Sequence, residues 1–208
     1  MTLMKKIILF ILFLLSGLSL MAQSSEPFPR PSFELGVGIQ LENFKGNLYD
    51  SYVGQMVPVN QISYAYAIMG SLNIPIKMVR ENLYIGINPN LDIAYSYKSI
   101  QTDIPVYLTL KYGAGSTKNA ESRFGFGLGA GGYFSAFSTY LTSFYSGYAF
   151  NYSSIYITPS AMGEFTFRTN NTGIYQIRFD FTPVSVEKTS GNFTGNIGQF
   201  NIRLVRPF

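Results

Sequence analysis

The sequence predicts an all-β fold, an eight-stranded antiparallel up-and-down transmembrane β-barrel. Apolar and polar residues alternate over eight segments, as in a sheet whose two faces meet different surroundings. Only 12% of the residues are charged, which is too few to coat a soluble domain. The chain also contains 16 tyrosines, 18 phenylalanines and 20 glycines, which suit strands with aromatic girdles and a crowded lumen.

Residues 1–22 have the features of a secretory signal peptide. Lys5 and Lys6 precede the apolar run 7–15, and Ala22 ends a stretch of small and apolar residues. This run is far shorter than the roughly 20 residues that a spanning helix needs. We therefore expect cleavage after Ala22, export to the periplasm and a mature barrel domain of residues 23–208. The chain has no cysteine, so a lipidated cysteine and disulfides are excluded.

The first four predicted strands alternate clearly. In residues 33–42 every odd position is apolar, and every even position is polar or glycine. The same period of two continues through residues 62–76, 83–97 and 103–112. Each of these segments therefore has one apolar face and one polar face.

The next three predicted strands are residues 123–134, 154–168 and 175–182. In the first of them glycines occupy every second position from Gly125 to Gly131, which leaves room in the lumen for Tyr84, Tyr107 or Lys111. The second is less regular because it contains a proline. A tight-turn sequence precedes the third.

The eighth predicted strand, residues 200–208, ends the chain. It places Phe200 and Leu204 on one face and Arg203 on the other. An exposed apolar edge invites aggregation, so we expect this strand to pair with the first one and close a barrel. A terminal aromatic after alternating apolar residues also resembles the C-terminal signal that the barrel-assembly machinery reads. Arg206 lies on the apolar face near the rim, where a long side chain can reach the lipid headgroups.

Both chain ends lie on one side of an eight-stranded barrel. If that side is periplasmic, the outer loops are residues 43–61, 98–102, 137–153 and 183–197. A further strand hidden in the first or third of these loops would change the strand count. A secreted soluble barrel with an apolar interior is the rival to a membrane barrel. Aromatics at strand ends with aliphatics between them favour contact with lipid.

The segment 103–112, Asp-Ile-Pro-Val-Tyr-Leu-Thr-Leu-Lys-Tyr, resembles the Ile-Pro-x-x-Leu-x-x-Lys-Tyr strand of PorT-like outer-membrane β-barrel proteins. The glycine-alternating segment 125–134 is similar to the next segment of that family. With the signal peptide, the chain length and the terminal Phe208, the resemblance spans nearly the whole chain. It implies a barrel in the bacterial outer membrane. The family is defined by its fold, so the resemblance implies no activity.

Seven charged residues are predicted to point into the lumen. They are Glu34, Asp92, Lys111, Glu164, Arg178, Asp180 and Arg203. Opposite charges fall on neighbouring strands, which predicts an ion-pair network in which Arg203 lies between Glu34 and Asp180. This network either fills the interior or lines a narrow selective pathway. Eight strands leave an interior just wide enough for side chains, so a large pore is not expected.

The predicted outer loop 137–153 is rich in aromatic residues. Besides Phe137 it contains Tyr140, Phe144, Tyr145, Tyr148, Phe150 and Tyr152. Exposed tyrosines and phenylalanines give large, stiff contact areas for a protein or glycan partner. Alternatively, these side chains extend the strands above the membrane and pack on one another.

Enzyme chemistry is not expected. The chain has no histidine and no cysteine, which removes Ser-His and Cys-His catalysis and the usual zinc ligands, and no cofactor is implied. The glycines of 127–132 match a dinucleotide fingerprint in spelling, but no helix is predicted after them. The formal net charge of +4 includes Lys5 and Lys6, and no basic stripe points to nucleic acid. We expect a structural or surface-interaction barrel of the outer membrane, or alternatively a narrow channel for small or apolar solutes.

Overall fold

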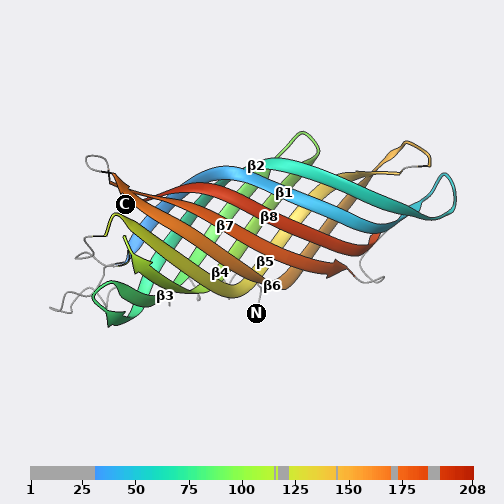
Figure 1. Ribbon diagram of the computed structural model, residues 1–208. Coiled ribbons are helices and arrows are strands. Elements are labelled where there is room, and N and C mark those ends of the chain that lie inside the picture. The colour runs from blue at the N-terminus through green and yellow to red at the C-terminus, as the bar shows by residue number, and fades with distance from the viewer. Residues whose placement is uncertain (1–30, 115, 117–121, 144, 170–172, 187–192) are drawn as a thin grey trace, which may run out of the picture.

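The computed structural model describes residues 31–114, 116, 122–143, 145–169, 173–186 and 193–208. They form eight strands: β1 (Ser32–Asp50), β2 (Gln55–Arg80), β3 (Leu83–Tyr95), β4 (Ser99–Gly113), β5 (Phe124–Thr142), β6 (Ala149–Thr169), β7 (Gly173–Val186) and β8 (Phe193–Pro207). Consecutive strands pair antiparallel and β8 pairs with β1, so the sheet closes (Figure 1). The predicted eight-stranded up-and-down barrel is confirmed. The predicted signal peptide lies outside the described residues, among which no helix is long and apolar enough to cross a membrane.

The last strand closes the ring, as its alternating pattern predicts. Val37 on β1 lies opposite Leu204 on β8, and both side chains point outward. At the end of the chain the backbone N–H of Phe208 donates a hydrogen bond to the carbonyl of Phe33 at 2.8 Å. Closure pairs the edges of both terminal strands, which removes the aggregation hazard of an open sheet.

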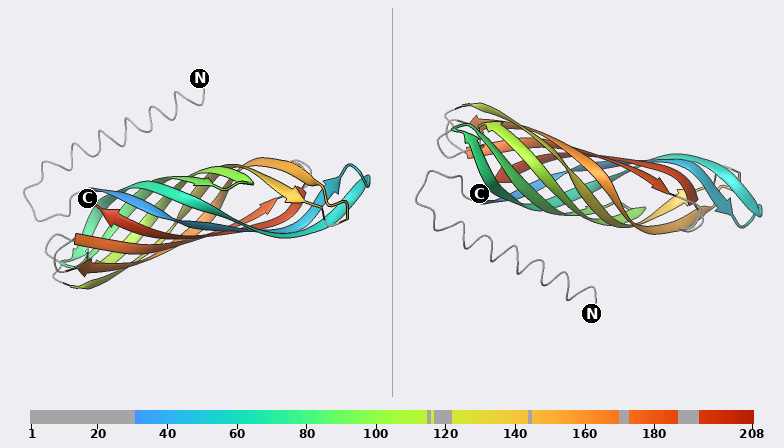
Figure 2. Two further views of the ribbon diagram at one scale, coloured as in Figure 1. Left: turned by 90° about the horizontal axis from the view of Figure 1, so that it is seen from above. Right: turned by 90° about the horizontal axis from the view of Figure 1, so that it is seen from below.

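Seven of the eight strands run beyond their predicted outer ends, so the predicted outer loops are mostly strand. Residues 43–61 contain the end of β1 and the start of β2. Residues 137–153 likewise hold the ends of β5 and β6, and residues 183–197 hold those of β7 and β8. Since β4 begins at Ser99, most of residues 98–102 is strand as well. These loop boundaries are therefore corrected. Figure 2 shows the β1–β2 hairpin as a long projection at this end of the barrel.

A reversal of polarity along the barrel axis explains the error. Up to Leu41 the outward side chains of β1 are apolar and the inward ones are polar or glycine. Beyond it the outward face carries Asn43 and Lys45, whereas the inward face buries Phe44 and Leu48. If apolar side chains are expected on the outside along the whole strand, the predicted strand ends at this point, although the backbone pairing continues.

The reversal occurs at a matching level on neighbouring strands. On β5 the outward residues change from Ala136 to Ser138, and on β6 they change from Ile155 to Ser153. Ala136 lies opposite Ile155, and Ser138 lies opposite Ser153. The apolar outward surface below this level requires hydrocarbon around it, and the polar surface above it suits water. We call the two parts the membrane section and the outer section.

The membrane section is nearly as tall as the apolar band of outer-membrane barrels. From Phe33 to Leu41 the apolar face of β1 covers eight residue steps, or roughly 20 Å at about 3.3 Å per residue and a tilt of about 40°. Outer-membrane barrels carry an apolar band about 25 Å tall. Exposed aromatic side chains lie at both borders, namely Tyr64, Tyr66, Tyr95 and Tyr97 at the outer one and Tyr112, Phe124 and Phe208 at the other. Arg206 lies 5.3 Å from the centre of the Phe208 ring at that second border.

Glycines on the inner face of β5 make room for larger side chains. A Cβ atom on Gly127 would collide with the side chain of Glu164, and one on Gly129 would press against Tyr107. Tyr107 is one of the side chains for which the sequence predicts this room. Glu164 occupies the space beside Gly127, and this position brings it into the ion pairs described below.

Candidate functional site

Near the chain ends, four buried side chains form what we call the balanced cluster. Lys111 Nζ on β4 lies 3.3 Å from Glu34 Oε1 on β1 and 2.8 Å from Glu164 Oε1 on β6. Arg178 Nη2 on β7 lies 2.6 Å from Glu34 Oε2 and 3.0 Å from Glu164 Oε2. Each base bridges both acids, so two positive charges face two negative ones.

Neutral side chains complete the balanced cluster. Ser71 Oγ donates to Glu34 Oε2 at 2.7 Å, and Asn88 Nδ2 donates to the same oxygen at 3.3 Å. Arg178 Nη1 donates to Asn90 Oδ1 at 3.3 Å. Buried ion pairs are tolerated when such hydrogen bonds satisfy the remaining polar atoms.

One level further from the chain ends, Arg203 on β8 bridges two acids. Its Nη2 lies 2.8 Å from Asp92 Oδ2 on β3, and its Nη1 contacts Asp180 Oδ2 on β7. The predicted contact of Arg203 with Glu34 is wrong. Gly38 is the β1 residue opposite Arg203, whereas Glu34 lies four residues away along β1, opposite Pro207. All seven predicted lumen residues are nevertheless buried and ion-paired.

A third polar group, which is not among the predicted sites, lies just below the outer section. We call it the carboxylate–amide cluster, and its members are Gln40, Glu42, Gln101, Asp103 and Gln199. Gln101 Nε2 donates to both Asp103 carboxylate oxygens at 2.8 and 2.9 Å. Gln40 Nε2 lies 2.6 Å from Gln101 Oε1 and 3.2 Å from Glu42 Oε1. Gln40 and Glu42 did occupy the polar face of the first predicted strand, so the alternation contained a signal for their inward position.

Apolar side chains fill the lumen of the outer section. The members of this outer plug are Phe44, Leu48, Val57, Val59, Phe137, Leu141, Tyr152, Val184, Phe193 and Ile197. The Phe44 ring centre lies 6.1 Å from that of Phe137 and 6.2 Å from that of Phe193. The plug covers the polar clusters from the outer end of the barrel.

The six aromatic residues predicted to face a partner lie in different places. Tyr140, Tyr145 and Tyr148 are exposed. Phe150 is half-buried against the outer plug. Tyr152 is only 3% exposed and belongs to the plug, so the prediction of a surface position is wrong for it, because it occupies an inward position of β6. Phe144 lies outside the described residues.

Two hairpins meet at the outer end of the barrel and form what we call the aromatic tip, made of Tyr52, Tyr145 and Tyr148. Tyr52, in the β1–β2 turn, stacks on Tyr148, in the β5–β6 connection, with 4.1 Å between ring centres and 14° between ring planes. Both rings stay accessible, at 68% and 53% exposure. Tyr52 is not among the predicted site residues, because its partner is distant in sequence.

Asp50 supports the aromatic tip from beneath. The backbone N–H groups of Tyr52 and Val53 donate to Asp50 Oδ1 at 2.9 and 3.3 Å. Burial acts to raise the pKa of Asp50, but hydrogen bonds from the Ser143 and Ser146 hydroxyls and from these two N–H groups outweigh it and hold the pKa below its ordinary value. The ionised carboxylate thus links the two hairpins.

The β3–β4 hairpin stops near the membrane border, since β3 ends at Tyr95 and β4 begins at Ser99. In the outer section β2 therefore faces β5 with no strand between them. Gln61 on β2 spans this gap: its Nε2 donates to the Tyr140 carbonyl at 3.0 Å, and its Oε1 accepts from the Thr142 N–H at 3.0 Å. One side-chain amide thus makes the pair of hydrogen bonds that a neighbouring strand would make.

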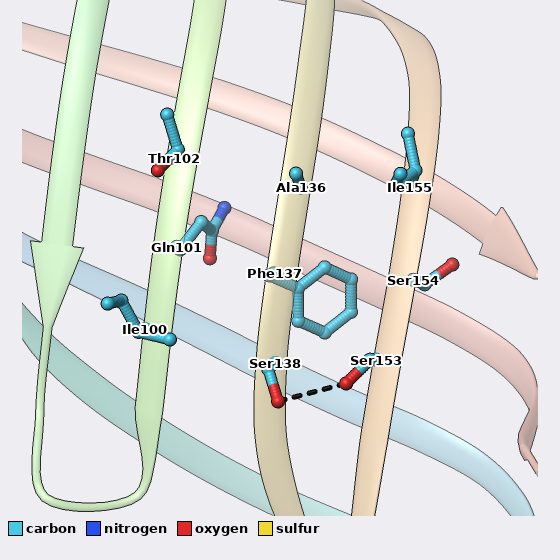
Figure 3. Close-up of a pocket in the computed structure, with 9 residues that line it drawn as sticks. All are labelled: Ile100, Gln101, Thr102, Ala136, Phe137, Ser138, Ser153, Ser154 and Ile155. Atoms are coloured by element: carbon cyan, nitrogen blue, oxygen red, sulfur yellow. Dashed lines mark hydrogen bonds between the residues drawn. The ribbon is translucent and has the colours of Figure 1, made fainter.

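A shallow groove of about 640 Å³ crosses β4, β5 and β6 at the level of the polarity reversal (Figure 3). Its lining residues are Ile100, Gln101, Thr102, Ala136, Phe137, Ser138, Ser153, Ser154 and Ile155. Ser153 Oγ donates to Ser138 Oγ at 2.9 Å across the strands. Apolar and hydroxyl side chains therefore meet in this groove, as expected at a membrane border.

The sequence matches no protein-family model and has no significant match among curated proteins. Solved structures with similar architecture include Neisserial surface protein A (11% identity, 85% of this chain and 97% of that chain, TM-score 0.46). The outer membrane protein OprG from Pseudomonas aeruginosa is 10% identical over 87% of this chain and 97% of its own, with a TM-score of 0.47. Ail of Yersinia pestis, in complex with the heparin analogue sucrose octasulfate, is 8% identical over 86% and 99%, with a TM-score of 0.42. Likenesses this distant assign no activity, and the barrel class of this chain rests on its own strand pairing and on the apolar outward face of its membrane section.

Proposed function

We propose that this chain is an integral protein of the bacterial outer membrane that binds a neutral glycan at its aromatic tip. The stacked pair carries this proposal, because Tyr52 and Tyr148 lie ring on ring, are hydrogen-bonded to Asp50 through the Tyr52 N–H and are still exposed. Tyrosine rings offer flat apolar faces to sugar rings, and their hydroxyls offer hydrogen bonds. Within residues 49–56 and 145–149 the only charged side chain is the buried Asp50, so the tip suits an uncharged ligand.

The test is binding of the refolded, detergent-solubilised protein to an array of neutral glycans. The double variant Tyr52→Ala/Tyr148→Ala removes the stacked pair, and we expect its affinity to fall roughly five- to thirtyfold, since one or two aromatic contacts of roughly 1 kcal/mol each are lost. The matched control is Tyr95→Ala/Tyr97→Ala, which removes two exposed tyrosines at the membrane border and should bind like the wild type.

The glycan proposal fails if the wild type binds no glycan, or if the tip variant binds as well as the wild type. Exposed tyrosines also suit apolar protein surfaces. Binding of a purified protein partner that the tip variant loses, with no glycan bound by either form, would assign the tip to protein recognition instead.

The alternative function, a narrow channel, has no observation in its favour. The balanced cluster, the Arg203 bridge and the carboxylate–amide cluster occupy successive levels of the lumen, and the outer plug covers them. An eight-stranded barrel offers little further space inside. We therefore do not propose conduction, catalysis or a cofactor for this chain.

We infer that the chain reaches the outer membrane by export through residues 1–22 and by insertion through the barrel-assembly machinery, which would read β8. Outer-membrane lipid then surrounds the membrane section, and the exposed apolar side chains with aromatic borders support this placement. Membership of the PorT-like family also remains a proposal. It rests on residues 103–112, which form most of β4, and on residues 125–134 of β5.

A further inference from the structure

The charges buried in the lumen do not balance. Among the described residues, six carboxylates and three bases are buried there. The balanced cluster is neutral, and Arg203 faces two acids. The remaining two acids, Glu42 and Asp103, form no ion pair with any base in the described part of the chain.

Among the described residues, only neutral groups donate hydrogen bonds to these two carboxylates. Asp103 accepts from Gln101 and from the Tyr133 hydroxyl. Glu42 Oε2 accepts from Ser63 Oγ at 2.9 Å, and its Oε1 has the longer 3.2 Å contact with Gln40. Glu42 thus has the weaker solvation of the two, although it is only 3% exposed.

The amides around Glu42 have too few hydrogens for the oxygens beside them. Gln101 Nε2 lies within 3.2 Å of four oxygens, two from Asp103 and one each from Ser135 and Gln199, yet an amide nitrogen carries two hydrogens. Gln40 Oε1 is fully buried and has no hydrogen-bond partner among the described residues. The cluster therefore presents unsatisfied oxygens as well as unbalanced negative charge.

We propose that the carboxylate–amide cluster binds one cation that the chain does not supply, at Glu42 beside the free oxygen of Gln40. An unpaired carboxylate is costly to take out of water, and a bound positive charge removes most of that cost. A proton on Glu42 and a hard metal ion held by carboxylate and amide oxygens both satisfy this requirement. No group of three or more His, Cys, Asp or Glu side chains in the described residues is placed to hold a metal, so amide oxygens would have to complete a metal shell.

The described groups around the site add no positive charge of their own. Asp103 on β4 acts on Glu42 with a like charge. Tyr133 on β5 hydrogen-bonds to Asp103, and Tyr156 on β6 hydrogen-bonds to Gln199. At the next level Arg203 is already engaged by two acids. A cation that enters during folding therefore meets a site of net negative charge.

The test compares the full-length mature wild type with Glu42→Gln, which has nearly the same shape and no charge. The readouts are the unfolding temperature of the refolded barrel and the infrared carbonyl band of protonated carboxyl groups. If the cation is a proton, the wild type shows that band at neutral pH, the variant lacks it, and the wild type alone loses stability as the pH is raised. If the cation is a metal, added calcium or sodium raises the unfolding temperature of the wild type, a chelator lowers it for calcium, and the variant responds to neither.

The matched control is Glu164→Gln, which removes an acid from the balanced cluster. It should lower the unfolding temperature at every pH and leave the dependence on pH or metal intact. The proposal is overturned if the wild type shows no protonated carboxyl band and no response to pH or metal ions. It is also overturned if Glu42→Gln destabilises the barrel as Glu164→Gln does. Asp103→Asn is the second variant for the same measurements should Glu42→Gln not refold.

Discussion

At the residue scale, the lumen is held together by basic side chains that each form ion pairs with two acidic ones. Arg178 joins Glu34 on β1 to Glu164 on β6, and it projects from β7. Its contacts therefore link strands that are not neighbours in the sheet. Such cross-lumen bonds stabilise the barrel section as a whole, because no single hairpin contains all the partners.

We expect Arg178→Met to destabilise the barrel by about 3 to 5 kcal/mol, because two buried acids then face Lys111 alone. The measurement is the urea midpoint of the refolded protein in micelles. Arg123→Met is the control, since Arg123 is an exposed arginine at the opposite end from the tip and should cost little. Equal effects of the two substitutions would contradict this account of the balanced cluster.

At the scale of elements, unequal hairpins shape the outer section. The β3–β4 hairpin ends at the membrane border, while the β1–β2 and β5–β6 hairpins continue to the aromatic tip. This leaves backbone groups of β2 and β5 without a neighbouring strand. The Gln61 side chain closes that gap, so a surface residue has a structural role that its position alone does not reveal.

Replacing Gln61 by alanine should expose the Thr142 N–H and speed its hydrogen exchange several-fold. The cost in overall stability should stay near 1 kcal/mol, because the two hydrogen bonds are solvent-exposed. Amide exchange followed by NMR or mass spectrometry measures the effect. Asn60→Ala, at the exposed neighbouring position, is the control. If the Thr142 amide of the Gln61 variant exchanges as slowly as in the wild type, contacts other than the Gln61 side chain close the gap between β2 and β5.

At the scale of the whole molecule, the surroundings to which the barrel surface is suited change along the barrel axis, from lipid to water. The membrane section is apolar outside and polar inside, and the outer section is the reverse. The outer section thus has the organisation of a water-soluble protein with its own apolar core. This organisation holds the aromatic tip at a distance from the bilayer, where a partner can reach it.

Spin labels on the outward face of β1 test this arrangement. Labels at Ile39 and Leu41 should be relaxed mainly by oxygen, which concentrates in acyl chains, and labels at Lys45 and Asn47 mainly by a water-soluble relaxing agent. The expected crossover lies near Asn43, where the outward side chains become polar. Preference for the water-soluble agent at all four labelled positions would refute the membrane section, and preference for oxygen at all four would refute the outer section.

The alternation of residues determined the barrel class, the inward position of the seven lumen charges and the need for β8 to close the ring. This was possible because a strand has a period of two, so neighbouring residues report directly on opposite faces. The same rule did not reveal the outer section. There the residues still alternate, but the apolar ones point inward and the polar ones point outward. Phe44 and Tyr152 were therefore assigned to loops.

Only the tertiary structure decided which partners meet. The stagger between β1 and β8 sets Arg203 against Asp92 and Asp180 and away from Glu34. Closure brings Tyr52 onto Tyr148, nearly a hundred residues later in the chain. A sequence states which way each side chain points, but the distance between side chains across a lumen depends on the register and tilt of all eight strands together.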